Sequence, residues 1–245
     1  MTRAVYVLSI RQLTGRWRLA ILLVLSAVPF AVAVAAGVSA DKPTAADLDD
    51  ALLNGLLAAA ILPIVVLTVA TAALGNELAD KTLGNLTLAP VAHARIVLAK
   101  LAAAITVCLP LLVGGAAGSV FLGFDLAGLP DAGRAATAAG VAIAVGVALY
   151  AAVFLWAGLV TSHPLIVGLL YVFVWEGLFG TFVNGVKYLS IRQYTLGVAK
   201  AVDASRFAGI DQHVLGSGAA ITGSAVVFCA FAALAVRRLR RMDVP

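Results

Sequence analysis

One carboxylate lies deep within an apolar run, and it is the residue with the clearest capacity for chemistry. Glu176 stands in the stretch FVWEGLFG and follows Pro164 by 12 residues. At about 1.5 Å per residue it would lie about 18 Å into a membrane span, past the midplane of a hydrocarbon core about 30 Å thick. An ionised carboxylate there costs at least about 2.5 kcal/mol on insertion scales. Two roles stay open: a place with Trp175 in a translocation path or subunit interface, or a hydrogen-bonded structural role.

The other residues that commonly perform chemistry are isolated from one another. His93, His163 and His213 have no second ligand at helical spacing, so we expect no metal site. Cys108 and Cys229 each lie inside an apolar run, where they act most simply as small hydrophobic side chains. The sequence contains no GxxxxGK[ST] phosphate loop, so the chain is not expected to bind ATP itself. We therefore expect no catalytic, cofactor-binding or metal-binding residue.

The composition identifies the medium that surrounds these residues. Of the 245 residues, 62% are hydrophobic and only 12% are charged, and the mean hydropathy is +1.05. Soluble domains have about 25% charged residues, so the exterior of this chain must face lipid. The net charge of +5 comes mainly from basic residues that flank apolar runs. That distribution indicates membrane topology and not nucleic-acid binding.

Six apolar runs are long enough to cross a bilayer. They lie near residues 19–38, 52–74, 97–123, 135–160, 164–185 and 217–236. The first ends in a small-residue sequence like a signal cleavage site, but its 20 residues exceed the 7 to 15 of a signal peptide, so we expect a retained span. With the N-terminus inside, inner segments hold eleven of the 17 Lys and Arg residues. We predict an all-α integral protein of the cytoplasmic membrane, one domain over 1–245, with six transmembrane helices and both termini cytoplasmic.

Two segments outside the spans have patterns of their own. Within residues 1–18, Tyr6, Ile10, Leu13 and Trp17 form one stripe at 100° per residue, which favours an N-terminal interfacial helix over an unstructured basic anchor. The long outer loop, 186–216, mixes aliphatic, aromatic and basic residues between spans five and six. It would either lie as a helix in the outer interface or dip into the membrane, and the sequence does not decide between these.

The inner segment between spans two and three, residues 75–95, is too long for a simple turn. Glu77 and Lys81 are four residues apart and would pair on one helical face, and Leu83 and Leu86 supply apolar contacts. Pro90 should end this helix before span three begins. The pattern predicts a short helix across the cytoplasmic surface.

This segment resembles one in the permeases of the type-2 ATP-binding-cassette (ABC) exporters. In that family an acidic residue is followed by a basic residue with Thr, then leucines, Pro-Val or Pro-Ile, Arg and Lys. The matching residues are Glu77, Lys81, Thr82, Leu83, Leu86, Pro90, Val91, Arg95 and Lys100. The six-span layout, cytoplasmic ends, interfacial helix and long last outer loop are also similar. The chain departs from the pattern at Ala89 and His93, where a basic residue is common, and at Asn85 and Thr87, where leucines are frequent.

The resemblance implies a partner and a mechanism. Residues 75–95 would be a coupling helix seated in a separate cytoplasmic ABC ATPase, which binds the ATP and Mg, and the permease would pair with a second copy or a sister permease and export its cargo. The simpler interpretation of the segment is an amphipathic loop helix with no partner. Rival classes are a secondary transporter, which would need paired broken, charged spans, and an intramembrane enzyme, for which Glu176 lacks an obvious catalytic companion. The sequence does not disclose the substrate.

Overall fold

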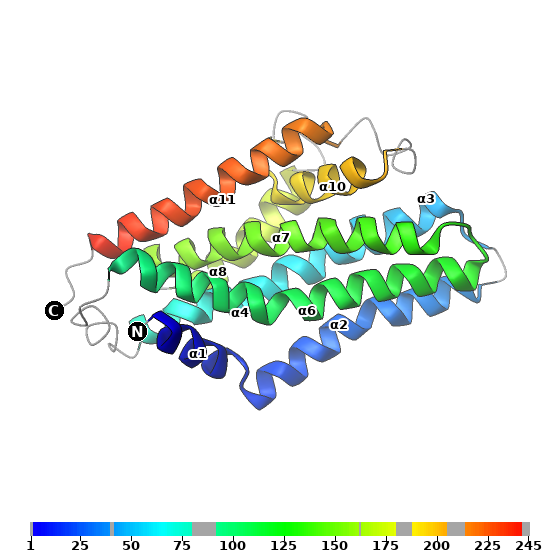
Figure 1. Cartoon of the computed structure of the whole chain (residues 1–245). Coiled ribbons are helices and arrows are strands. Elements are labelled where there is room, and N and C mark those ends of the chain that lie inside the picture. Colours follow the sequence, from blue (N-terminus) through cyan, green and yellow to red (C-terminus); the bar gives the residue numbers. More distant parts are fainter. Residues whose placement is uncertain are drawn as a thin grey trace.

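The computed structural model describes residues 2–39, 42–79, 92–161, 163–179, 188–204 and 214–241. Its regular elements in that part of the chain are helices, and most of them run lengthwise along one elongated bundle (Figure 1). They are α1 (Thr2–Leu13), α2 (Arg16–Gly37), α3 (Ala45–Leu48), the π-helix η1 (Asp49–Ile61), α4 (Leu62–Ala79), α6 (His93–Ala127), α7 (Ala132–Val160), α8 (Pro164–Leu170), the π-helix η2 (Tyr171–Phe179), α10 (Ile191–Val202) and α11 (Ser217–Arg240).

Five of these helices are long and apolar enough to cross a membrane. They cover Arg16–Gly37, Ala45–Leu74, His93–Ala127, Ala132–Val160 and Ser217–Arg240, with 22 to 35 residues each. About 20 residues at 1.5 Å span a hydrocarbon core of about 30 Å, so the predicted spans one to four and six are confirmed as helices of sufficient length. The predicted fifth span, 164–185, corresponds to α8 and η2 up to residue 179, and its remainder lies outside the described residues. Six crossings therefore stay a prediction.

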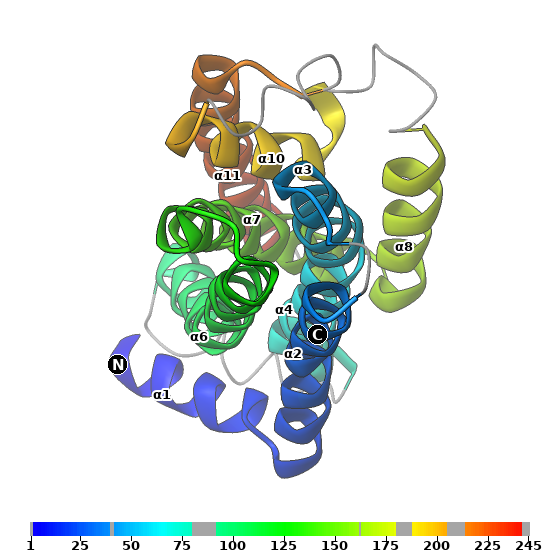
Figure 2. The same cartoon turned by 90° about the vertical axis from the view of Figure 1, so that its right-hand side faces the viewer.

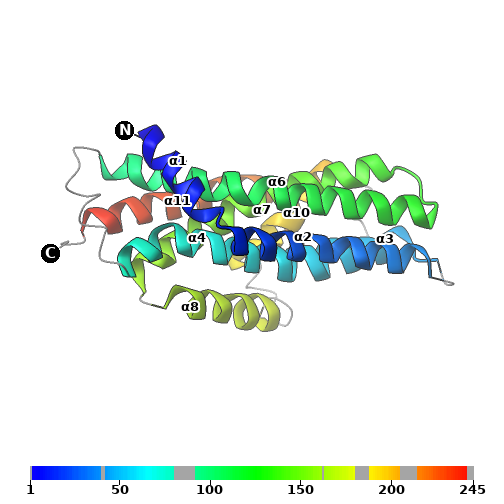
Figure 3. The same ribbon diagram turned by 90° about the horizontal axis from the view of Figure 1, so that it is seen from below.

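The two ends of the bundle differ in what they hold. The start of α1, the end of α4, the start of α6 and the end of α11 lie together at one end (Figures 1 and 3). The turn between α6 and α7 lies at the opposite end with α3. The described helices on either side of residues 80–91 thus approach the same end as both termini, as the predicted topology requires.

The second span begins earlier than its hydropathy predicts. We expected it at residue 52, but the helix starts at Ala45 because Thr44 and Asp47 form a capping box. The Thr44 amide donates to the Asp47 carboxylate at 2.9 Å, and the Asp47 amide donates to the Thr44 hydroxyl at 3.3 Å. Asp49 is consequently buried in the bundle, at 2% exposure, although it precedes the predicted start of the span at residue 52.

The predicted N-terminal helix is real but shorter than residues 1–18. Helix α1 ends at Leu13, and Gly15 takes an extended conformation before α2 starts at Arg16. Leu13 is buried and Ile10 packs against the core. Trp17 does not continue that face, because the break at Gly15 resets the helical period, and 85% of its surface is exposed. Its position at the start of a span is typical of interfacial aromatic residues.

Helix α7 is the centre of the bundle. It packs against α4, α6, α10 and α11, and Figure 2 shows it between α6 and α10. Helices α2 and α11 are much less buried in the bundle than α7. Small residues permit the close contacts: a side chain on Gly115 would meet the Ser26 carbonyl oxygen of α2 at 3.0 Å. A side chain on Gly146 of α7 would meet Leu62. Lipid supplies no hydrophobic force between helices, so such close approach is what holds the spans together.

The predicted outer loop, 186–216, contains an ordered helix among its described residues. Helix α10 packs against α7 and α11, and Ile191, Leu196 and Val198 are among its buried residues. It lies beside the half of α7 that is remote from the termini (Figure 1). Whether this segment lies in the outer interface or dips into the membrane stays a prediction.

Candidate functional site

The carboxylate of Glu176 is enclosed in the bundle and accepts hydrogen bonds from three directions. Its side chain is 2% exposed. The Tyr150 hydroxyl donates to Oε2. Oε1 accepts from the Tyr171 hydroxyl at 3.1 Å, from the Ile191 amide at 2.9 Å and, more weakly, from the Arg192 amide at 3.4 Å. These hydrogen bonds offset part of the free-energy cost of burying a carboxylate inside the bundle.

The π-helical winding of η2 brings Tyr171 to Glu176. In an α-helix, residues five apart are rotated by about 140° from each other, which would point these two side chains away from one another. The i to i+5 bonding of a π-helix returns such residues to nearly the same face. Tyr171 also meets the ring of Phe154 edge to face, with centroids 6.4 Å apart. The wide helix therefore shapes one wall of the carboxylate pocket.

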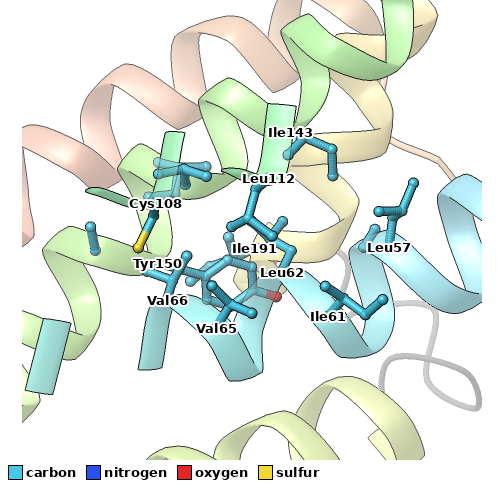
Figure 4. Close-up of a cluster of buried hydrophobic side chains, with 14 of the residues drawn as sticks. Leu57, Ile61, Leu62, Val65, Val66, Cys108, Leu112, Ile143, Tyr150 and Ile191 are labelled. Carbon is cyan, nitrogen blue, oxygen red and sulfur yellow. The ribbon is translucent and has the colours of Figure 1, made fainter. Parts of the chain in front are cut away.

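Tyr150 supplies the opposite wall from α7. Its ring stacks on Phe154 with centroids 5.4 Å apart and is fully buried. Figure 4 shows it within a cluster of apolar side chains from several helices. Those labelled around it are Leu57, Ile61, Leu62, Val65, Val66, Cys108, Leu112, Ile143 and Ile191. In such surroundings the phenol needs a hydrogen-bond partner, and Glu176 provides it.

The third side of the pocket is the N-terminus of α10. The first amides of a helix have no partner within it, and they carry the positive end of its dipole. Glu176 accepts from the amides of Ile191 and Arg192, while the N-cap residue Ser190 accepts from the Gln193 amide at 3.4 Å. The carboxylate of Glu176, from η2, thus completes the N-terminal cap of α10.

Two further polar ties hold α10 in place. The Arg192 guanidinium donates to the side-chain oxygen of Asn54 in η1, at 3.0 Å from Nε and 2.6 Å from Nη2. Asn54 in turn donates to Asp50 at 2.7 Å. At the other end of α10, Arg134 of α7 pairs with Asp203 at 3.1 Å, the two side chains being 61% and 6% exposed. Helix α10 is therefore attached by polar groups at both ends.

The chemistry available to Glu176 follows from this enclosure. All four contacts use the carboxylate as an acceptor, and the side chain is nearly inaccessible. The geometry favours the hydrogen-bonded structural role over direct contact with a cargo, and a place in the translocation path stays a prediction. Trp175, named with it, lies next to it in η2 and is half-buried.

The predicted coupling residues fall largely outside the described part of the chain. Lys81, Thr82, Leu83, Leu86 and Pro90 lie in the segment 80–91, which the structure does not describe. The backbone of Glu77 belongs to the last turn of α4, and Arg95 is exposed in the first turn of α6. The two ends of the predicted coupling segment thus continue two long helices of the bundle.

Sequence reasoning missed most of the residues around Glu176. Tyr150 is a lone polar residue in an apolar run, which is a weak signal that it has a buried partner. Tyr171, Asn54 and Arg192 carried no such signal, because their meeting depends on π-helical winding and on the burial of α10. Among the described residues, no three His, Cys, Asp or Glu side chains lie together as a metal site would need.

The fold and site define a multi-pass helical membrane protein in which a few buried polar groups hold a helix in position. Residues 15–175 match the family model for ABC-2 family transporter proteins. That match covers more than half of the chain, and the chain therefore belongs to the ABC-2 transporter family. No curated protein matches the sequence. The family is that of the membrane component of a transporter, which agrees with the five long apolar helices.

Proposed function

We propose that this chain is the permease subunit of an ABC exporter in the cytoplasmic membrane, driven by a separate ATPase that binds ATP and Mg. Family membership carries the proposal. It is supported by the absence of a phosphate-binding loop in the sequence, which assigns hydrolysis to a partner. It is also supported by the placement of the ends of α4 and α6 at the end of the bundle that holds both termini (Figure 1).

The ATPase would act on the segment that joins α4 to α6. In the sequence, Leu83 and Leu86 lie between two predicted spans, where neither lipid nor the bundle core is expected to cover them. A cleft in a cytoplasmic partner would bury them. Closure of two ATPase subunits would then move α4 and α6 in each of two permeases, which are two copies of this chain or this chain and a sister. Alternating exposure of a path between the two permeases would carry the cargo outward.

Helix α10 has a distinct part in this proposal. It lies in the outer half of the bundle, with Glu176 at its first turn and Arg134 near its last. We infer that it closes the outer end of the permease. Glu176 then serves transport by holding this closure in position, and the cargo does not need to touch the carboxylate.

The proposal is tested by placing charge in the coupling segment. Leu83→Asp with Leu86→Asp would put uncompensated carboxylates into an apolar contact, which costs several kcal/mol of association. The variant should reach the membrane at the normal level and lose the ATPase that co-purifies with the wild type. Ala46→Asp, which adds one carboxylate at the exposed start of the second span, is the control and should retain the ATPase. Normal ATPase stoichiometry in the double variant would contradict this role of the segment.

A further inference from the structure

A lysine is buried between the two helices that lead into the proposed coupling segment. Lys100 of α6 is 1% exposed, and its ammonium donates to the carbonyl oxygen of Ala73 in α4 at 2.6 Å. Lysine is almost never fully buried unless it is paired, because removing an ammonium from water is costly. The packing next to these residues along both helices is apolar: Leu74, Val97 and Leu101 are each at most 2% exposed. The position therefore requires an explanation beyond packing.

The contact joins the two helices at matching heights. Ala73 lies six residues before the end of α4 at Ala79, and Lys100 lies seven residues after the start of α6 at His93. At 1.5 Å per residue, both helices continue for about 9 to 10 Å beyond the contact. The hydrogen bond thus joins two antiparallel helices at about the same height, just before the chain leaves α4 for residues 80–91.

The direction of the hydrogen bond suits a cation. Carbonyl oxygens carry the negative end of the peptide dipole, so the Ala73 carbonyl oxygen is a suitable acceptor for an ammonium. Ala73 has a small side chain, which leaves the carbonyl accessible to a long side chain from α6. Helix α1 reinforces the same region, because the Tyr6 hydroxyl bonds to the Thr106 hydroxyl of α6 at 3.0 Å and α1 also packs on α4.

We propose that Lys100 is a positioning residue that locks α4 to α6, so that movement of the coupling segment reaches the membrane as a displacement of both helices together. This inference rests on the proposed function. Packed helices slide past one another by shear when their contacts are purely apolar and non-directional. A charged hydrogen bond fixes the register of the two helices, since sliding by one turn would separate the Lys100 ammonium from the Ala73 carbonyl oxygen.

The test compares three side chains at this position in the purified complex with its ATPase. Lys100→Met removes the charge and keeps the length, and Lys100→Leu is a second apolar variant. Both place an apolar side chain among the buried apolar residues that surround this position. Lys100→Arg keeps a cation and donors and is the conservative variant. Spin labels on Ala46→Cys and Gly218→Cys, two exposed positions in different helices, report movement in a background without Cys108 and Cys229.

The measurement is the change in the distance distribution between the two labels when ATP, Mg and vanadate trap the closed ATPase. In the apolar variants, the population that shifts should fall at least about fivefold, the lower end of typical couplings between sites, while co-purified ATPase and ATP hydrolysis stay normal. The arginine variant should restore the shift. An undiminished shift in Lys100→Met or Lys100→Leu would overturn the proposal. So would failure of both apolar variants to assemble while Lys100→Arg assembles normally, because Lys100 would then serve folding. If no ATPase co-purifies with the wild type, that result contradicts the proposed function, on which this inference rests.

Discussion

Replacing Glu176 by leucine removes the acceptor on which the first turn of α10 depends. The Ile191 amide and the Tyr150 hydroxyl would lose their partner inside the bundle, whereas Tyr171 also contacts the Leu189 carbonyl oxygen at 3.4 Å. A buried donor left without an acceptor costs about 1 to 3 kcal/mol. Two such donors destabilise the attachment of α10 by about 2 to 6 kcal/mol relative to the wild type.

Glu176→Gln should be milder than leucine. The amide oxygen can still accept from Ile191 and Tyr171, and the amide nitrogen can donate to the Tyr150 hydroxyl oxygen. The Tyr150 O–H then loses the acceptor that Glu176 gave it, but the Ile191 amide keeps its own, so fewer donors are left unpaired than with leucine. The variant also loses the extra strength of hydrogen bonds to a charged acceptor, which are roughly twice as strong as neutral ones. The order of α10 stability should therefore be wild type, then glutamine, then leucine.

Hydrogen exchange measured by mass spectrometry reads this order directly. A loss of about 2 kcal/mol raises the opening equilibrium about 30-fold, so amides in residues 188–204 should exchange at least that much faster in Glu176→Leu. Ser26→Ala, which removes a buried hydroxyl far from α10, is the control and should leave this peptide unchanged. Equal protection of residues 188–204 in the leucine variant and the wild type would refute the reasoning. Acceleration spread evenly over α2, α6 and α7 would also refute it, because the effect would then be global.

Two further predictions concern packing and topology. Gly146→Val should lower the thermal stability of the purified protein by about 1 to 3 kcal/mol, because a side chain would meet Leu62 and Thr195, whereas Gly114→Ala, with no atom within 4 Å, should be neutral. Equal melting temperatures for these variants would contradict the close packing of α7. In a background without native cysteines, Ala46→Cys should react with an impermeant thiol reagent in intact cells and Arg241→Cys only after permeabilisation; the reverse pattern would overturn the proposed orientation.

The long spans were predictable because hydropathy alone determines them. A bilayer core requires about 20 consecutive apolar residues, and no soluble alternative fits runs of that length. Their ends were less predictable, since they depend on specific backbone contacts. The capping box at Thr44 extends the second span by seven residues, and the extended conformation of Gly15 separates Trp17 from the stripe that the periodicity assigned to it.

The site around Glu176 was predictable only as a single residue. Its depth in an apolar run indicates that a hydrogen-bond partner must exist, because a carboxylate is costly to bury in a membrane whatever the fold around it. The identity of the partners does depend on the fold. Tyr171 reaches it through π-helical winding, and Ile191 and Arg192 reach it because a segment with basic residues folds into the bundle instead of remaining outside.

The distribution of burial indicates which helices can move. In their most apolar stretches, α7 is 72% buried, whereas α2 and α11 are 22% and 17% buried. Displacing a helix that mainly touches lipid exchanges one apolar contact for another, while displacing α7 or α10 breaks a packed interior and its hydrogen bonds. The helix formed by α8 and η2 combines exposed and buried parts. Ile166 and Leu170 of α8 are more than 60% exposed, but Glu176 of η2 is hydrogen-bonded to α10. If α8 moves while the hydrogen bonds of Glu176 to α10 stay intact, the helix must bend near Tyr171, where the α-helical winding changes to π.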